Sequence, residues 1–383
     1  MEIYRRLGVR PVINCATTYT RLGGSIMAPQ VAQAMADAAS CFVNIFELQE
    51  AIGRRLAELT HNEAAYISNG AAAGLALATA ACITGEDVAL MARLPTNLAG
   101  LKNEVVVHRS QRNWYDIAIR QTGVKLVEIG HTMETQPWEL DDAINERTAA
   151  VVYFAGSHLN RNTLPLPYVI ERAHARGVPV IVDAAAQLPP VSNLWYFTRE
   201  LGADVAIFSG GKGLAGPQNS GLVVGREAII RAIRLNGPPY QRFGRAMKVA
   251  KETMIGLLAA VELYVSADHA ARAAAWSEVV DSWHAAWQGA LAPGVMLWRE
   301  ETNEAGEPIP RLLLRFGAGA PVNRDQMVEL LRSGDPPIEV VLNDATSIAF
   351  SPHLLQPGEA EVVQERVLHV LGTLSVARPA RTR

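Results

Sequence analysis

One lysine and one aspartate in this sequence combine a reactive side chain with a position at the end of an apolar, strand-like run. Lys212 lies in the glycine-rich segment Ser-Gly-Gly-Lys-Gly that begins at Ser209, and Asp183 ends the preceding run of this kind. The stretch between them is long enough for one strand–helix–strand step. A lysine amine can form a Schiff base with the aldehyde of pyridoxal phosphate (PLP), and a carboxylate can keep the pyridine nitrogen protonated so that the ring accepts electrons. The pair predicts PLP chemistry, with Lys212 and Asp183 as catalytic residues.

Each of these residues also has a simpler interpretation. A lysine in a glycine-rich loop can be a solvated turn residue or the lysine of a nucleotide phosphate loop. Gly213 follows Lys212, however, where such a phosphate loop requires serine or threonine. An aspartate after a strand often caps the next helix. The order and spacing of the two residues together favour the cofactor.

The phosphate of the cofactor needs its own binding segment, and residues 68–74 (Ser-Asn-Gly-Ala-Ala-Ala-Gly) are suited to it. They join a short strand-like run to a helix of small residues. The first N–H groups of a helix and its positive partial charge favour a phosphate. An alanine-rich helix start is also common where a helix simply packs closely. Ser209, three residues before Lys212, is a further candidate donor to the phosphate.

A sheet must position these residues, and the sequence predicts one. Apolar runs rich in β-branched residues on both sides of the pleat suit strands that are buried on both faces. We expect strands at residues 64–67, 88–92, 104–108, 125–129, 149–154, 178–183 and 205–209. Helices are expected at residues 29–39, 47–59, 71–83 and 166–176. This alternation predicts a doubly wound α/β domain with a mostly parallel sheet.

The pattern changes after residue 224. A long helical tract is expected at about residues 245–291 and contains a tryptophan stripe, which is typical of a core or a subunit interface. The stripe consists of Trp276, Val280, Trp283 and Trp287. Short strands are expected at 311–316, 338–342 and 347–350, and a last helix at 359–376. We expect an N-terminal arm (1–50), a large domain (51–240) and a smaller C-terminal α+β domain (241–383) that includes the long connecting helix.

Composition narrows the class of protein. The chain has 383 residues, 49% of them hydrophobic, and a formal net charge of −3. This charge implies neither nucleic acid nor an anionic membrane as a partner. The three cysteines are too few and too scattered for a disulfide framework or a zinc site, and the N-terminus has no apolar signal region, so we expect a cytoplasmic protein. The nine histidines show no metal-ligand spacing, and we expect no metal.

Several stretches resemble the fold-type I PLP enzymes, and more narrowly the selenocysteine-synthase-like group that includes the D-glucosaminate-6-phosphate ammonia-lyase family. The matching stretches cover most of residues 8–255, including 12–14, 68–74, 183–190, 202–204, 209–212, 216–218 and 244–248. The resemblance is most specific around Asp183 and Lys212. It implies the fold-type I PLP-dependent transferase fold, with a large, mostly parallel sheet domain and a smaller C-terminal α+β domain, assembled as a homodimer or a higher homo-oligomer.

The resemblance also implies roles at the matching positions. Lys212 holds the cofactor covalently and later removes the Cα proton, while Asp183 pairs with the pyridine nitrogen. Ala185 lies against one face of the ring. The phosphate is bound by Gly70, Ala71, Ala72 and Ser209. Relatives carry a histidine near the ring where this chain has Gln111, so contact with the ring falls to Gln111, Trp114 or Tyr115.

Substrate contacts are expected from three segments. His158 and Asn160 follow the strand at 149–154, and loops at the carboxyl ends of strands bind ligands in such folds. Asn14 and Tyr19 lie in the N-terminal arm, which closes over the site in relatives. A substrate carboxylate is best held by an arginine fork. Arg315 is the first candidate, and its rivals are Arg311, Arg21 and Arg245.

The activity that we favour is a PLP-dependent lyase on an amino acid or aminosugar acid, acting through Cα deprotonation and β-elimination with release of ammonia. The same cofactor also serves aldolases, racemases and aminotransferases, and these remain alternatives. Selenium transfer on tRNA is disfavoured, because no basic patch is visible. A nicotinamide oxidoreductase lacks support, since no Gly-x-Gly-x-x-Gly unit follows a strand. A non-catalytic binding protein is disfavoured by the intact Lys212 and Asp183.

Overall fold

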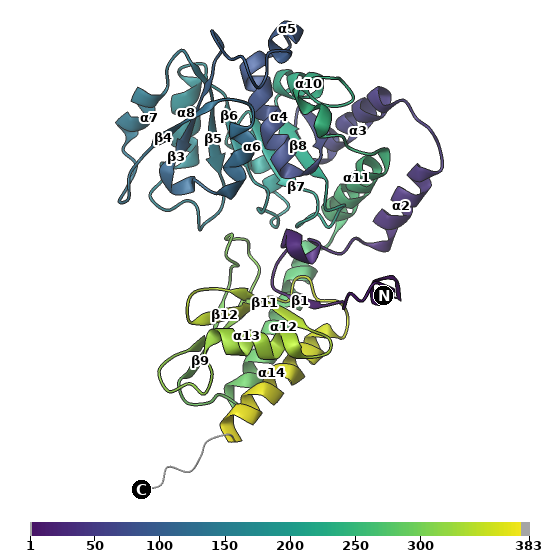
Figure 1. The fold of residues 1–383 in the computed structure, drawn as a ribbon, viewed down its shortest axis with the longest axis vertical. Helices are drawn as coiled ribbons and strands as arrows, with labels where there is room; N and C mark the ends of the chain where they lie inside the picture. The colour runs from purple at the N-terminus through teal and green to yellow at the C-terminus, as the bar shows by residue number, and fades with distance from the viewer. Residues whose placement is uncertain (1, 377–383) are drawn as a thin grey trace. The chain divides into compact units, whose positions relative to one another are not determined.

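The computed structural model describes residues 2–376 of the chain (Figure 1). The chain divides into two compact units. The larger comprises Ser25–Ala267, and the smaller combines Met1–Gly24 with Asp268–Arg383. The N-terminal residues belong to the smaller unit because their one strand pairs there. The division expected from the sequence, into an arm (1–50), a large domain (51–240) and a C-terminal domain (241–383), stays a prediction.

The larger unit is built on a seven-stranded sheet in the order β2-β8-β7-β6-β5-β3-β4. β8 runs antiparallel to both of its neighbours, and the pairs among β7, β6, β5, β3 and β4 are parallel. The strands are β2 (Ala64–Ser68), β3 (Glu104–His108), β4 (Lys125–Ile129), β5 (Thr148–Phe154), β6 (Val180–Asp183), β7 (Val205–Ser209) and β8 (Gly221–Gly225). The predicted mostly parallel α/β architecture is confirmed.

Helices cover both faces of this sheet (Figure 1). Alternate strand residues face opposite sides, so that Val106 and Val182 join one apolar core while Val105 and Ile181 join the other. Helices α3, α8 and α11 contribute to the first core, and α4 and α10 to the second. The helices of this unit are α2 (Pro29–Ala39), α3 (Ile45–Leu59), α4 (Gly70–Thr84), α5 (Val88–Met91), α6 (Ile117–Arg120), α7 (Pro137–Ala143), α8 (Leu166–His174), α9 (Asn193–Trp195), α10 (Glu227–Asn236) and α11 (Lys251–Ser266).

The smaller unit holds a five-stranded sheet in the order β1-β11-β12-β10-β9. Its strands are β1 (Ile13–Cys15), β9 (Val295–Glu300), β10 (Arg311–Phe316), β11 (Ile338–Leu342) and β12 (Ser347–Phe350). Its helices are α1 (Glu2–Arg6), α12 (His269–Gln288), α13 (Arg324–Ser333) and α14 (Glu359–Val376). Of the tryptophan stripe, Val280, Trp283 and Trp287 lie in the core of this unit, whereas Trp276 is only partly buried and lies edge-on to His353. Trp283 and Trp287 stack with ring centroids 5.5 Å apart, and both contact Phe350.

Two expected elements are wrong. Residues 88–91 form the short helix α5 rather than a strand, because the Asp87 carboxylate accepts hydrogen bonds from the N–H groups of Ala89 and Leu90 and so caps a helix. The tract at 245–291 is two helices rather than one, since Asp268 caps a new helix by accepting from the Ala271 N–H. Strands β1, β8 and β9 were not expected from the sequence.

Helix α4 is unusual in being apolar on every side, and it packs closely against the sheet. A Cβ atom added at Gly74 would lie 2.9 Å from both the Ser68 hydroxyl and a Val223 methyl group. Small residues therefore let the start of α4 approach β2 and β8. Within residues 2–376, no single helix is long and apolar enough to cross a membrane, although α11 and α12 meet that criterion together as a bent pair.

Candidate active site

The carboxyl ends of four neighbouring parallel strands bring the predicted catalytic residues to one edge of the large sheet. β3 ends at His108, β5 at Phe154, β6 at Asp183 and β7 at Ser209. Ligands bind at this edge in open α/β sheets. Lys212 follows Ser209 by one tight turn, in which the Lys212 N–H lies 3.4 Å from the Ser209 carbonyl oxygen.

The glycines beside Lys212 are there because the loop is crowded by its neighbours. A Cβ atom at Gly211 would lie 2.4 Å from the Gln218 Cα, and one at Gly213 would lie 2.2 Å from the Leu188 carbonyl oxygen. The backbone around Lys212 is therefore closely packed against its neighbours. The Lys212 amine makes no hydrogen bond or ion pair with any residue in the described part of the chain. A fixed backbone with an uncommitted amine suits covalent attachment of an aldehyde.

Asp183 is poised for a cationic partner. Burial raises the pKa of its carboxyl group, while the Ala185 N–H and the charge of Lys212 act in the opposite direction. The Ala185 N–H donates to Oδ1 at 3.0 Å, and Oδ2 has no hydrogen-bond partner within residues 2–376. A desolvated carboxylate is stabilised by a nearby positive charge. The protonated nitrogen of a pyridine ring is such a charge, so Asp183 fits the cofactor.

The start of α4 offers donors for a phosphate. Gly70 begins the helix with a φ of 79°, and Asn69 at the N-cap makes no side-chain capping hydrogen bond. Ala71 is partly exposed and Ala72 is exposed, so neither side chain shields the backbone of the first turn. Uncapped N–H groups at a helix start form an anion site. The residues present fit PLP at both its ring and its phosphate.

Gly221 also belongs to this region and was not selected from the sequence. It lies in β8 directly opposite Ser68 on one side and Ser209 on the other. A Cβ atom there would lie 2.5 Å from the Gly70 carbonyl carbon. Its only signal in the sequence is a glycine at the start of an apolar run, which is too common to identify a site.

Gln111 is fully buried and is engaged by β5. The Phe154 N–H donates to its Oε1 at 3.2 Å, and its Nε2 donates to the Phe154 carbonyl oxygen at 3.1 Å. Nε2 also lies 3.3 Å from Asn160 Oδ1. Both ends of the amide are thus used by the protein. Of the other two candidates for ring contact, Trp114 is 94% exposed and Tyr115 is 63% exposed. Contact of any of the three with a cofactor stays a prediction.

His108 supports the same region as a neutral histidine. It is fully buried, and its Nε2 accepts a hydrogen bond from the Leu164 N–H at 3.2 Å. Burial lowers the pKa of His108 to about 4, although Gln111 opposes this effect. The Leu164 N–H needs a lone pair on Nε2, so the proton of the neutral ring is on Nδ1. His108 therefore anchors the end of the loop that follows β5.

That loop carries two of the predicted substrate residues. His158 and Asn160 are both exposed. The loop starts beside Asp183, because the Ala155 N–H donates to the Asp183 carbonyl oxygen at 2.9 Å. Predicted residues that share this edge of the larger unit are Gly70, Ala71, Ala72, Gln111, His158, Asn160, Asp183, Ala185, Ser209 and Lys212.

The other predicted substrate residues, Asn14, Tyr19 and Arg315, lie in the smaller unit. Asn14 is used locally, since its Nδ2 donates to the Thr17 carbonyl oxygen and its Oδ1 accepts from the Ala16 N–H, both at 3.1 Å. The Arg21 guanidinium lies 5.2 Å from the centre of the Tyr19 ring. Substrate contact by these residues stays a prediction.

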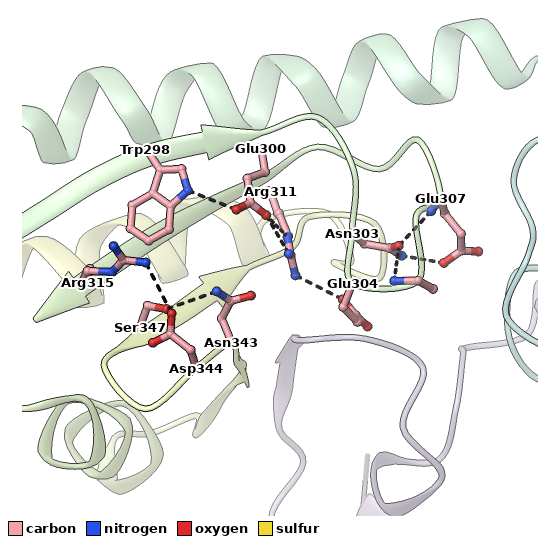
Figure 2. Close-up of polar contacts among 11 residues, drawn as sticks. Trp298, Glu300, Asn303, Glu304, Glu307, Arg311, Arg315, Asn343, Asp344 and Ser347 are labelled. Carbon is pink, nitrogen blue, oxygen red and sulfur yellow. Dashed lines mark hydrogen bonds and ion pairs between the residues drawn. The ribbon is translucent and has the colours of Figure 1, made fainter. Parts of the chain in front are cut away.

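The two arginines of strand β10 differ in how firmly they are paired (Figure 2). Arg311 is buried and bonds to Glu300 at 2.6 Å and to Glu304 at 3.3 Å. Arg315 lies over the Trp298 ring at 4.9 Å and contacts Asp344 at 3.4 Å. Its Nε is buried and has no hydrogen-bond partner among the described residues. Arg315 is therefore freer than Arg311 to bind an added carboxylate.

Comparison with known proteins agrees with this geometry. The chain is 35% identical over 377 residues to D-glucosaminate-6-phosphate ammonia lyase from Salmonella typhimurium, covering 96% of this chain and 98% of that protein. It is 34% identical over 380 residues to a 5'-C-glycyluridine monooxygenase-decarboxylase from a Streptomyces species, covering 96% and 92%. An L-seryl-tRNA(Sec) selenium transferase from Nitratidesulfovibrio vulgaris is 31% identical over 272 residues, covering 66% and 55%.

Solved structures show the same fold. A structure of D-glucosaminate-6-phosphate ammonia-lyase superposes with a TM-score of 0.82 at 33% identity, covering 97% of this chain and 99% of that one. A structure of SPT with PLP superposes with a TM-score of 0.61 at 14% identity, which shows the fold alone. The fold is thus that of the fold-type I PLP enzymes. The family described as SelA, L-seryl-tRNA selenium transferase, matches residues 12–279. Together with the full-length relatives, this match establishes that the chain belongs to the SelA family of fold-type I PLP enzymes.

Proposed function

We propose that this chain is a PLP-dependent lyase that removes ammonia from an amino acid or aminosugar acid carrying a hydroxyl group on Cβ. The observation that carries the proposal is that an uncommitted Lys212 amine and the desolvated Asp183 carboxyl group follow the ends of adjacent strands β7 and β6. The full-length likeness to an ammonia lyase supports this reaction type.

When bound, PLP supplies an electron sink for the charge left at the substrate Cα. Lys212 would hold the cofactor covalently through Nζ, and the same amine would serve as the base for the Cα proton. Asp183 holds the proton on the pyridine nitrogen. The first turn of α4, with Gly70, Ala71 and Ala72, binds the phosphate through backbone N–H groups.

The balance of the reaction is simple. The substrate loses a proton from Cα and hydroxide from Cβ, which together make water. Water then adds back as the amino group leaves, so the net products are a 2-keto acid and ammonia. Nζ of Lys212 is the group that moves the Cα proton, and no external oxidant or reductant is required.

Cofactor attachment is tested first because it does not depend on the substrate. The protein is incubated with PLP, reduced with borohydride and digested, and the mass of the peptide that contains Lys212 is measured by mass spectrometry. We expect the added mass of the reduced cofactor on that peptide, its absence in Lys212→Ala, and full retention in the exposed-lysine control Lys102→Ala. Attachment elsewhere, or none, refutes the cofactor assignment.

The reaction is tested by measuring ammonia and keto-acid release from D-glucosaminate 6-phosphate and from a panel of 2-amino-3-hydroxy acids. Oxygen consumption is followed in the same samples, because one relative of nearly equal identity is named as a monooxygenase-decarboxylase. Stoichiometric ammonia and keto acid without oxygen uptake supports the lyase. Oxygen uptake without a 2-keto acid refutes it and favours the second chemistry.

A further inference from the structure

The amide of Gln111 has one permitted orientation because both of its ends face the same backbone residue. Phe154 presents an N–H to Oε1 at 3.2 Å and a carbonyl oxygen to Nε2 at 3.1 Å. A flipped amide would set donor against donor and acceptor against acceptor. Gln111 is fully buried, so water cannot satisfy either mismatch. The backbone of β5 therefore decides which end of Gln111 is the donor.

The second hydrogen on Gln111 Nε2 transmits this choice to Asn160. Nε2 lies 3.3 Å from Asn160 Oδ1, and an amide nitrogen can only donate. Asn160 must therefore turn its oxygen toward Gln111 and its Nδ2 away. Asn160 is exposed, and in the described part of the chain its Nδ2 has no hydrogen-bond partner. The result is a fixed N–H donor at the ligand-binding edge of the sheet.

The backbone near Asn160 is also tied to the sheet. The Asn160 carbonyl oxygen accepts from the Thr163 hydroxyl at 3.0 Å, and the next residue, Leu164, donates its N–H to His108 at 3.2 Å. The start of the loop is bonded to Asp183 through Ala155. A donor held at both ends of its loop is preorganised, so it contributes more to binding than a mobile one.

We infer that Gln111 is a positioning residue that makes Asn160 a substrate-binding hydrogen-bond donor, selective for an anionic oxygen of the substrate. This inference rests on the proposed function, since it places the substrate at the same edge as Lys212 and Asp183. It also explains how a buried glutamine serves this site without touching the substrate itself. Reversing the hydrogen-bond polarity at either residue is expected to weaken binding of an anionic substrate while leaving the proton transfer at Lys212 largely intact.

Asn160→Asp is the most direct test, because it has nearly the same shape. One carboxylate oxygen still accepts from Gln111, but the Nδ2 donor becomes a charged acceptor. We expect KM for D-glucosaminate 6-phosphate to rise roughly tenfold or more, the usual effect of losing a charge-assisted hydrogen bond, with a much smaller change in kcat. Asn97→Asp is the matched control, since this exposed residue uses only its Oδ1, toward the Ala99 N–H. D-Glucosaminate without phosphate, run alongside, shows whether the contacted oxygen belongs to the phosphate or to the carboxylate.

A double-mutant cycle tests whether Gln111 acts through Asn160. Gln111→Glu removes the Nε2 donor, and we expect it to raise KM in the wild-type background but not in Asn160→Ala. The exposed Gln121→Glu carries the same charge change and is expected to leave KM unaltered. If Gln111→Glu is poorly folded, Gln111→Met replaces it, because methionine keeps the side-chain volume but leaves the Asn160 amide free to turn. Gln111→Met is likewise expected to raise KM in the wild-type background but not in Asn160→Ala. Additive effects on KM would overturn the inference.

Cofactor attachment at Lys212 separates this inference from the proposed function. For each variant, the mass of the borohydride-reduced peptide that contains Lys212 is measured by mass spectrometry alongside the kinetics. Normal attachment together with a KM unchanged by Asn160→Asp overturns the inference and leaves the proposed function standing. A wild-type protein that attaches no PLP overturns the proposed function, and the inference falls with it. Normal attachment with the KM increase and the non-additive cycle supports both.

Discussion

Substituting Gly221 by alanine should weaken cofactor binding through a purely steric displacement. The added Cβ would lie 2.5 Å from the Gly70 carbonyl carbon, 2.6 Å from the Ser68 hydroxyl and 2.7 Å from the Gly70 oxygen. An ordinary van der Waals contact of a Cβ atom is no shorter than about 3.4 Å. The first turn of α4 therefore has to move away by about 0.9 Å, or the sheet has to open by that amount. Both Gly70 atoms belong to the backbone, so no side-chain rotation relieves the contact.

The magnitude follows from what the turn is proposed to bind. A retreat of about 0.9 Å stretches a hydrogen bond of about 2.9 Å beyond its useful range. Loss of one bond to a charged phosphate costs about 1.5–3 kcal/mol, which corresponds to a Kd for PLP that is roughly 10- to 100-fold higher. Overpacking also destabilises the fold by about 1–3 kcal/mol.

The assay is titration of the cofactor-free protein with PLP, followed by absorbance, with thermal unfolding of the same samples. Gly289→Ala is the matched control, because a Cβ there meets nothing within 4 Å and its φ of −80° suits alanine. We expect normal PLP binding in the control and weakened binding in Gly221→Ala. A Gly221→Ala protein with a lowered Tm but wild-type affinity for PLP would refute the assignment of the α4 start as the phosphate site.

Two further predictions concern pH. Burial raises the folded-state pKa of Asp183, so its contribution to stability is greatest below about pH 3.9 and is lost as the pH rises through the folded value. Cofactor-free Asp183→Asn should thus gain stability relative to wild type as the pH rises above about 4; urea unfolding at several pH values measures this, and a constant difference would contradict it. For His108, whose pKa is lowered to about 4, wild-type stability should fall as the pH drops from about 6.5 to about 4. His108→Gln should flatten that fall by up to about 3 kcal/mol, and an unchanged slope would show that His108 does not titrate there.

The sequence by itself predicted the sheet and the two residues on which the proposed chemistry rests. A lysine and an aspartate after two apolar runs could be recognised because parallel strands bring their carboxyl ends to one edge, whatever the details of packing. Most strands of the large sheet were predictable, since strands buried on both faces need continuous β-branched runs. Local caps were harder to foresee. Asp87 turned an apparent strand into α5, and Asp268 divided an apparent single helix.

Only the tertiary structure decided the contacts between distant segments. That Gly221 lies between Ser68 and Ser209 depends on the insertion of an antiparallel strand, which no local pattern specifies. The engagement of Gln111 by Phe154 likewise depends on β3 and β5 becoming neighbours although β4 separates them in sequence. Residue type revealed which groups could do chemistry, whereas the direction in which a buried amide points is set by the backbone that packing places beside it.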